Sequence, residues 1–172
     1  MFTCEETGGR PNSVAAMTFT VRPAIDDQED RNFILSLNSR LAEVIDAPTH
    51  STSEVIAFQD RFTATAWDES VTANTTLIAI AEDGERLGYI NLRETDDEMT
   101  QGKCGYIALL AVTRAAEGTG VGQFLMQQAE VWAKQMGFER LCLDVFASNL
   151  RGRHFYEKMG YAPETMRITK RV

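Results

Sequence analysis

Apolar residues in the first third of the chain recur at helical spacing, which predicts two helices behind a short strand. Residues 18–22 alternate in polarity as a strand does, and Pro23 ends the pattern. A first helix is predicted over residues 26–44 and a second over 52–62, which opens at a capping-box sequence, Ser51-Thr-Ser-Glu54. The apolar positions of the first helix are Phe33, Leu35, Leu37, Leu41 and Val44.

The pattern changes to strands in the middle of the chain. Residues 75–82 and 87–93 are two predicted strands, and the Asp83-Gly84 turn between them indicates an antiparallel hairpin. The nearly continuous apolar run over residues 105–112 is typical of a central strand that is covered on both faces.

The last third predicts an alternation of helices and strands. A helix follows residue 120 and ends at Gly137, and a second helix spans 149–159 and ends at Gly160. Strands are predicted at 141–146 and 166–172. The order β-α-α-β-β-β-α-β-α-β predicts a single α/β domain over residues 17–172, with a mixed central sheet flanked by helices and a loose leader at 1–16.

Charge and composition narrow the function classes. The chain of 172 residues has a net charge of −8, and residues 1–86 hold 15 Asp and Glu against only 6 Lys and Arg. Such an acidic half repels nucleic acid and would attract cationic small molecules. The alternative is that these acids are solvated charges on the surface of helices. No apolar run reaches membrane-spanning length and no signal pattern opens the chain, so we expect a cytoplasmic protein without a membrane partner. The three cysteines form no CxxC pair, and no metal site is expected.

The segment EGTGVG, residues 117–122, lies between a predicted strand and a predicted helix. Glycines let the backbone approach a phosphate, and the following helix offers free N–H groups, so a dinucleotide or coenzyme A is the expected ligand. Asp144 lies at the spacing of a ribose-binding acid, but the glycines do not read GxGxxG and Asp144 is predicted inside its strand. These points, and the short chain after the loop, disfavour a dinucleotide oxidoreductase.

The glycine loop and a second motif further along the chain together resemble the motifs of the Gcn5-related N-acetyltransferase (GNAT) superfamily. The family loop, Gln/Arg-x-x-Gly-x-Gly/Ala, corresponds to Glu117, Gly120 and Gly122. The downstream motif, Asn-x-x-Ala-x-x-x-Tyr-x-x-x-Gly-Phe, corresponds to the stretch from Asn149 to Tyr161, with Gly152 in place of alanine. Because Glu117 replaces Gln or Arg, it offers no side-chain donor and adds negative charge beside the expected pyrophosphate.

The resemblance implies acetyl transfer from acetyl-CoA and assigns roles to residues. Tyr156 would be the general acid that protonates the departing thiolate, and Asp144 the candidate base, from the similarity of LDVFASN to ribosomal-protein alanine N-acetyltransferases. A water held by Glu85, Glu94 or Asp96 is the alternative base. The implied cofactor-binding positions are Leu110, Ala111, Val112, Glu117, Gly118, Thr119, Gly120, Val121, Gly122, Asn149 and Tyr156.

The expected function is therefore acetyl-CoA-dependent N-acetylation of a small, cationic primary amine by direct attack. Two alternatives remain open at this point. One is a non-catalytic acyl-CoA-binding regulatory module, and the other is a protein N-terminal acetyltransferase. Dimers are common in the family, so the resemblance leaves a homodimer open, although the sequence itself does not determine the oligomeric state.

Overall fold

The computed structural model describes residues 18–67 and 74–172, and the predicted leader lies outside them. Five strands form one sheet in the order β1-β2-β3-β4-β5, antiparallel throughout except for the parallel pair β4 and β5. The strands are β1 (Phe19–Pro23), β2 (Thr75–Ala81), β3 (Arg86–Asp96), β4 (Lys103–Val112) and β5 (Leu141–Leu143). The predicted mixed α/β architecture is confirmed.

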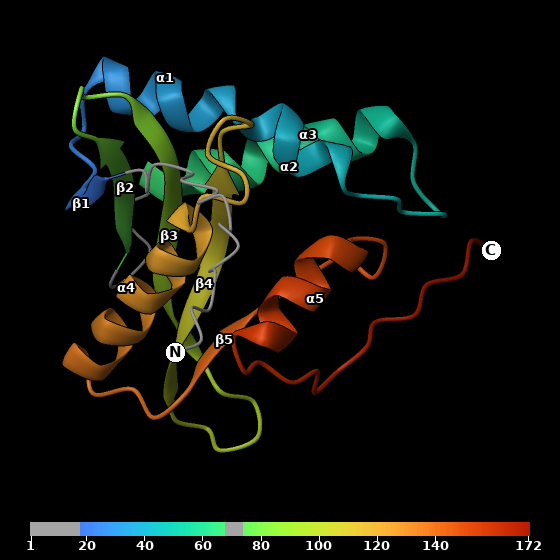
Figure 1. The fold of residues 1–172 in the computed structure, drawn as a ribbon. Coiled ribbons are helices and arrows are strands. Elements are labelled where there is room, and N and C mark those ends of the chain that lie inside the picture. Colours follow the sequence, from blue (N-terminus) through green and yellow to red (C-terminus); the bar gives the residue numbers. More distant parts are fainter. Residues whose placement is uncertain (1–17, 68–73) are drawn as a thin grey trace, which may run out of the picture.

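Helices cover both faces of the sheet (Figure 1). The helices are α1 (Gln28–Ser36), α2 (Asn38–Glu43), α3 (Thr52–Ala64), the short 3-10 helix η1 (Thr65–Trp67), α4 (Val121–Gln135) and α5 (Leu150–Lys158). Ile34 and Leu37 pack with Tyr89 on one face, whereas Leu125 and Met126 of α4 fill the core of the other. Alternate residues of a strand point to opposite faces, so β3 and β4 are covered on both.

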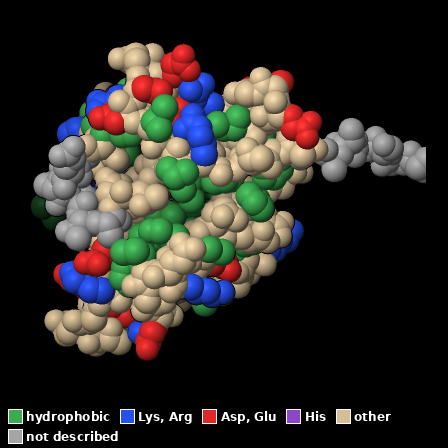
Figure 2. Space-filling model, turned by 90° about the vertical axis from the view of Figure 1, so that its left-hand side faces the viewer, with side chains coloured by type: hydrophobic (Ala, Val, Ile, Leu, Met, Phe, Trp, Pro, Cys, Tyr) green, Lys and Arg blue, Asp and Glu red, His purple; other side chains and the backbone are tan. Residues whose placement is uncertain are grey.

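The outer surface reflects this layering. Figure 2 shows hydrophobic side chains across the middle of the side where β1 lies, with acidic and basic side chains gathered above and below them. At this edge Phe19 of β1 meets Phe124 of α4, with ring centroids 5.4 Å apart. Among the described residues, no helix has the length and apolar character needed to cross a membrane.

Several local predictions are confirmed. Ser51 and Glu54 form the capping box of α3, and the hairpin joins β2 to β3. Gly137 and Gly160 end α4 and α5 with φ of +79° and +90°, the left-handed conformation that glycine adopts at little cost. The predicted helix over 26–44 is two helices instead, because Leu37 is both the C-cap of α1 and the N-cap of α2.

Two predicted strands are wrong in the C-terminal third. β5 has three residues, Leu141–Leu143, instead of six, and residues 166–172 form no strand. A strand is defined by its hydrogen-bonded partner, and no strand among the described residues pairs with 166–172. Near the end of that segment, Arg171 donates a hydrogen bond to the carbonyl oxygen of Thr49 at 2.8 Å.

A buried ion cluster joins α1 to the sheet. Asp30 is fully buried and accepts hydrogen bonds from Arg22 of β1 at 2.6 and 2.9 Å and from Arg86 of β3 at 2.8 Å. The backbone N–H of Ile25 also donates to Asp30 at 2.9 Å. The Arg22 guanidinium holds the pKa of the Asp30 carboxyl well below its usual range, so this side chain is ionised at neutral pH.

Candidate functional site

The centre of the candidate site is the point where β4 and β5 separate. Their pairing covers only Gly105 to Ile107 of β4, because β5 ends at Leu143. β4 continues to Val112, still paired with β3. An open edge of β4 is therefore left beside α5, as Figure 1 shows.

The backbone of β4 decides which amides face this opening. The N–H of Thr113 donates to the carbonyl oxygen of Leu87 in β3 at 2.8 Å. Since successive N–H groups of a strand alternate in direction, the N–H of Ala111 also points to β3, and those of Leu110 and Val112 point to the open side. Of the three strand residues among the implied cofactor-binding positions, two thus have an N–H that faces the gap.

The glycine loop leads from this edge into α4. Gly118 and Gly120 have φ of +75° and +94°, and Gly120 is the N-cap of α4 without a side-chain cap. The N–H of Thr119 is bonded within the turn, to Ala116 at 3.3 Å. The N–H groups of Gly118 and Gly120 have no acceptor among the described residues, and those of Val121 and Gly122 belong to the first turn of the helix, where no intrahelical acceptor exists. This arrangement fits a pyrophosphate.

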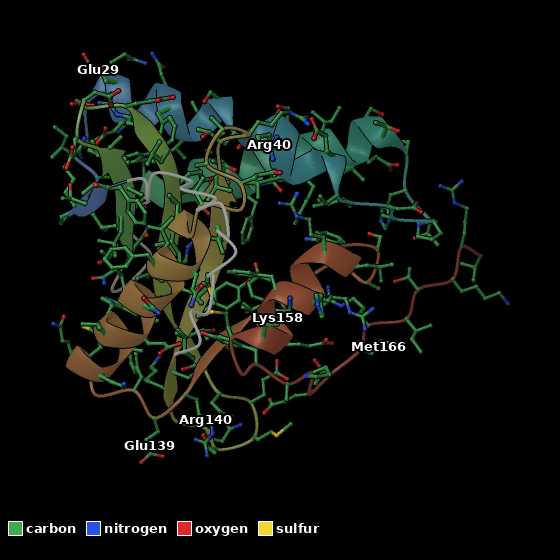
Figure 3. The ribbon with its side chains drawn as sticks, in the orientation of Figure 1. Glu29, Arg40, Glu139, Arg140, Lys158 and Met166 are labelled. Carbon is green, nitrogen blue, oxygen red and sulfur yellow. The ribbon has the colours of Figure 1, made fainter. Side chains whose placement is uncertain are left out.

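Glu117 carries a charge that is balanced by two arginines. One carboxylate oxygen forms an ion pair with Arg40 of α2, and the other accepts from Arg151 of α5 at 2.8 Å. Arg151, and then Arg40, hold the pKa of Glu117 below its ordinary value. No local pattern of residues indicated these contacts, because Arg40 lies 77 positions from Glu117. Figure 3 shows Arg40 on α2, beside the loop between β4 and α4.

Helix α5 places the second motif next to the opening. The Asn149 side chain caps α5 by accepting from the N–H of Gly152 at 2.9 Å. A side chain at position 152 would place its Cβ within 2.5–2.9 Å of the Asn149 amide, so glycine at this position is what leaves room for the cap. An alanine here, as in the family motif, would require the Asn149 side chain to shift.

Tyr156 faces inward from α5. Its ring packs against the core formed with α4, beside Phe155 at 5.3 Å and Tyr161 at 6.2 Å between centroids. Burial raises the pKa of Tyr156 to about 12, so the phenol keeps its proton at neutral pH. Its hydroxyl makes no hydrogen bond to any residue that the structure describes, which leaves it available to a ligand.

Asp144 follows β5 directly instead of lying within it, so the predicted position inside the strand is wrong. It is exposed and accepts a hydrogen bond from the Tyr106 hydroxyl at 3.1 Å. Burial, and then the Asp144 charge, raise the pKa of Tyr106. Tyr106 is not among the residues that the sequence predicted for the site. The register between β4 and β5 pairs Tyr106 with Cys142 and so puts residues 106 and 144 on one face, and this register is known only from the structure.

The other candidate acids and the histidines lie elsewhere. Glu94 and Asp96 pair with Lys103, at 3.3 and 2.7 Å, near the end of β3 remote from the glycine loop. Glu85 lies in the β2–β3 turn. His154 is exposed, 3.8 Å from Glu157. In the described part of the chain, no group of three or more His, Cys, Asp or Glu side chains is placed to hold a metal ion.

A groove of about 490 Å³ lies between α2 and α3. Its walls include Ile45 and Val55, and three acidic residues line it: Glu43, Asp46 and Asp60. The connection between these helices also contacts the β5–α5 segment, because the Asp46 N–H donates to the Ser148 hydroxyl at 2.9 Å.

The sheet that opens between β4 and β5, with a glycine loop at a helix N-terminus, defines an α/β protein whose loop can accept a phosphate-bearing ligand. Residues 40–161 match the sequence profile of the Acetyltransferase (GNAT) family, and this chain belongs to that family. The suspected resemblance is confirmed.

Related proteins and solved structures agree with this assignment. The uncharacterized N-acetyltransferase YdgE of Bacillus subtilis is 34% identical over 91 residues, 53% of this chain and 57% of YdgE. The mycothiol acetyltransferase of Jonesia denitrificans is 47% identical over 55 residues, 32% of this chain and 18% of that protein. The matches thus span from about a fifth to just over half of these curated relatives.

Two solved structures share the fold. A GCN5-related N-acetyltransferase from Ralstonia eutropha superposes with a TM-score of 0.69 at 22% identity, over 90% of this chain and 99% of that one. A predicted acetyltransferase of Clostridium acetobutylicum, solved with acetyl-CoA, gives a TM-score of 0.60 at 18% identity, over 90% of this chain and 96% of that one.

Proposed function

We propose that this protein is an acetyl-CoA-dependent N-acetyltransferase that acts on a small primary amine. The observation that carries the proposal is the conjunction of three features at one place. These are the open edge of β4, the glycine loop with its free N–H groups, and the inward-facing Tyr156. Family membership supports acetyl transfer as the reaction of this site.

Bound acetyl-CoA would supply the acetyl group as a thioester. The free amides of Gly118, Gly120 and the first turn of α4 would hold its pyrophosphate. The N–H groups of Leu110 and Val112 would bind the pantetheine arm. Such a backbone donor aimed at the thioester oxygen would also stabilise the developing oxyanion by about 3 kcal/mol.

The two proton transfers are assigned to Tyr156 and Asp144. The phenol of Tyr156 would donate its proton to the departing thiolate, and its high pKa keeps that proton in place before the reaction. Asp144 would accept a proton from the attacking ammonium, directly or through a water, with Tyr106 as the hydrogen-bond donor that orients its carboxylate. An amine with a pKa of about 10.4 is almost wholly protonated at pH 7, so such a base is needed.

A cationic acceptor is favoured by charge. The protein has a net charge of −8, concentrated in its first half, and the groove between α2 and α3 has an acidic lining. Amines with a positive charge would accumulate near this surface. Homodimer formation remains a prediction from the family resemblance.

The test is release of free thiol from acetyl-CoA in the presence of a broad amine panel, including diamines, amino sugars and peptides with a free N-terminus. Turnover with small cationic amines is expected. Turnover with peptides alone would assign the protein to N-terminal acetylation. Acetyl-CoA binding without turnover on any amine would indicate the regulatory module instead.

A further inference from the structure

The glycine loop begins with an acid, yet its surroundings carry a positive charge. Arg40 and Arg151 each pair with Glu117, and Arg114 nearby pairs with Glu43 at 3.1 Å. Three guanidinium groups therefore face two carboxylates at this end of the sheet. The local balance is one positive charge, in a protein whose net charge is −8.

The two arginines on Glu117 differ in what else holds them. Arg40 is 20% exposed and also donates from Nε to the carbonyl oxygen of Val112 at 3.1 Å, so it is a fixed link between α2, β4 and the loop. Arg151 is 73% exposed, and its hydrogen bond to Glu117 is the only one it makes within the described residues. A guanidinium has five N–H donors, so most of those of Arg151 are free.

The position of Arg151 places these free donors beside the proposed anion site. Its Nη1 lies 2.8 Å from the carboxylate of Glu117, the residue directly before Gly118. A guanidinium can bind a phosphate through two parallel hydrogen bonds, and a charged donor makes the stronger contact.

We propose that Arg151, positioned by Glu117, is a phosphate-binding residue of the acetyl-CoA site. It takes the place of the Gln or Arg that the family loop has at its first position. The positive group reaches the phosphates from α5 instead of from the loop, and Glu117 holds it there. This inference rests on the proposed binding of acetyl-CoA.

The test is calorimetric titration of the full chain with acetyl-CoA at low and at high salt, for the wild type, Arg151→Gln and Lys158→Gln. Lys158 is the matched control because it loses the same charge from the same helix. It lies at the opposite end of α5, as Figure 3 shows. Arg151→Gln is expected to weaken binding about fivefold at low salt, and the difference should shrink as salt increases.

Lys158→Gln is expected to bind as the wild type does. Equal binding by wild type and Arg151→Gln would overturn the inference, and so would a loss that is independent of salt, since that indicates a structural role. A thermal melt of each variant without ligand checks that the fold is intact. A wild type that does not bind acetyl-CoA would overturn the proposed function as well, so the two failures are told apart.

Discussion

Arg40 of α2 and Glu117 of the glycine loop form an ion pair that joins two parts of the chain 77 positions apart. Arg40 also donates to the carbonyl oxygen of Val112, the last residue of β4. The pair therefore fixes the helical layer to the point where the open strand turns into the glycine loop. Both side chains are three-quarters buried or more, so water screens their attraction only in part.

Glu117→Gln is expected to lower the thermal midpoint, because the mostly buried Arg40 would lose its counterion. Glu43→Gln is the matched control, since it removes a carboxylate from the far more exposed pair with Arg114 and should change the midpoint little. Differential scanning calorimetry of the three proteins measures both effects. An equal fall of the thermal midpoint in the two variants would show that the buried Arg40 pair stabilises the fold no more than the exposed Arg114 pair does.

Gly120→Ala and Gly122→Ala are expected to change the free energy of unfolding differently, although the two residues are only two positions apart. Gly120 has φ of +94°, where an alanine side chain costs about 1–2 kcal/mol. A Cβ on Gly122 would lie 3.8 Å from its nearest neighbours, an ordinary contact, and alanine suits a helix better than glycine. Urea unfolding should show that Gly120→Ala is less stable than the wild type and that Gly122→Ala is not. Destabilisation by Gly122→Ala alone would contradict the left-handed conformation of Gly120.

Tyr156→Phe is expected to reduce kcat about 100-fold and to leave KM for acetyl-CoA nearly unchanged, because the variant lacks only the proposed proton donor. Since burial raises the pKa of Tyr156 to about 12, its ionisation should not limit the wild-type rate below about pH 11. Steady-state rates across pH 6–10 test both points. Full activity of Tyr156→Phe would remove this residue from the mechanism.

Asp30→Asn is expected to destabilise the fold by about 3 kcal/mol, because Arg22 and Arg86 would be left without their shared carboxylate. The folded-state pKa of Asp30 lies below its unfolded value. The stabilisation that ionised Asp30 gives to the folded state is therefore present above the ordinary aspartate pKa of about 3.9 and is lost as the pH falls below that value. The stability of the variant should accordingly depend less on pH in the acid range, as urea unfolding at pH 3 to 7 would show.

Local signals in the sequence predicted those elements whose causes are local. The capping box at Ser51 and Glu54, the Asp83-Gly84 turn and the glycine ends at Gly137 and Gly160 each depend on a few neighbouring residues. The motif from Glu117 to Gly122 likewise gave the loop and the helix behind it. The strand predicted at 166–172 failed because apolar alternation gives no information on whether a partner strand is present.

The sequence by itself determined the family, the layered α/β fold, and the positions of the glycine loop and Tyr156, because these are set by residue type and spacing along the chain. Only the tertiary structure decided how the charge of Glu117 is balanced, since Arg40 and Arg151 reach it from α2 and α5. It also decided that β5 ends at Leu143, so that β4 is left open and Asp144 meets Tyr106. Such long-range contacts follow from the packing of whole elements, and no short stretch of residues encodes them.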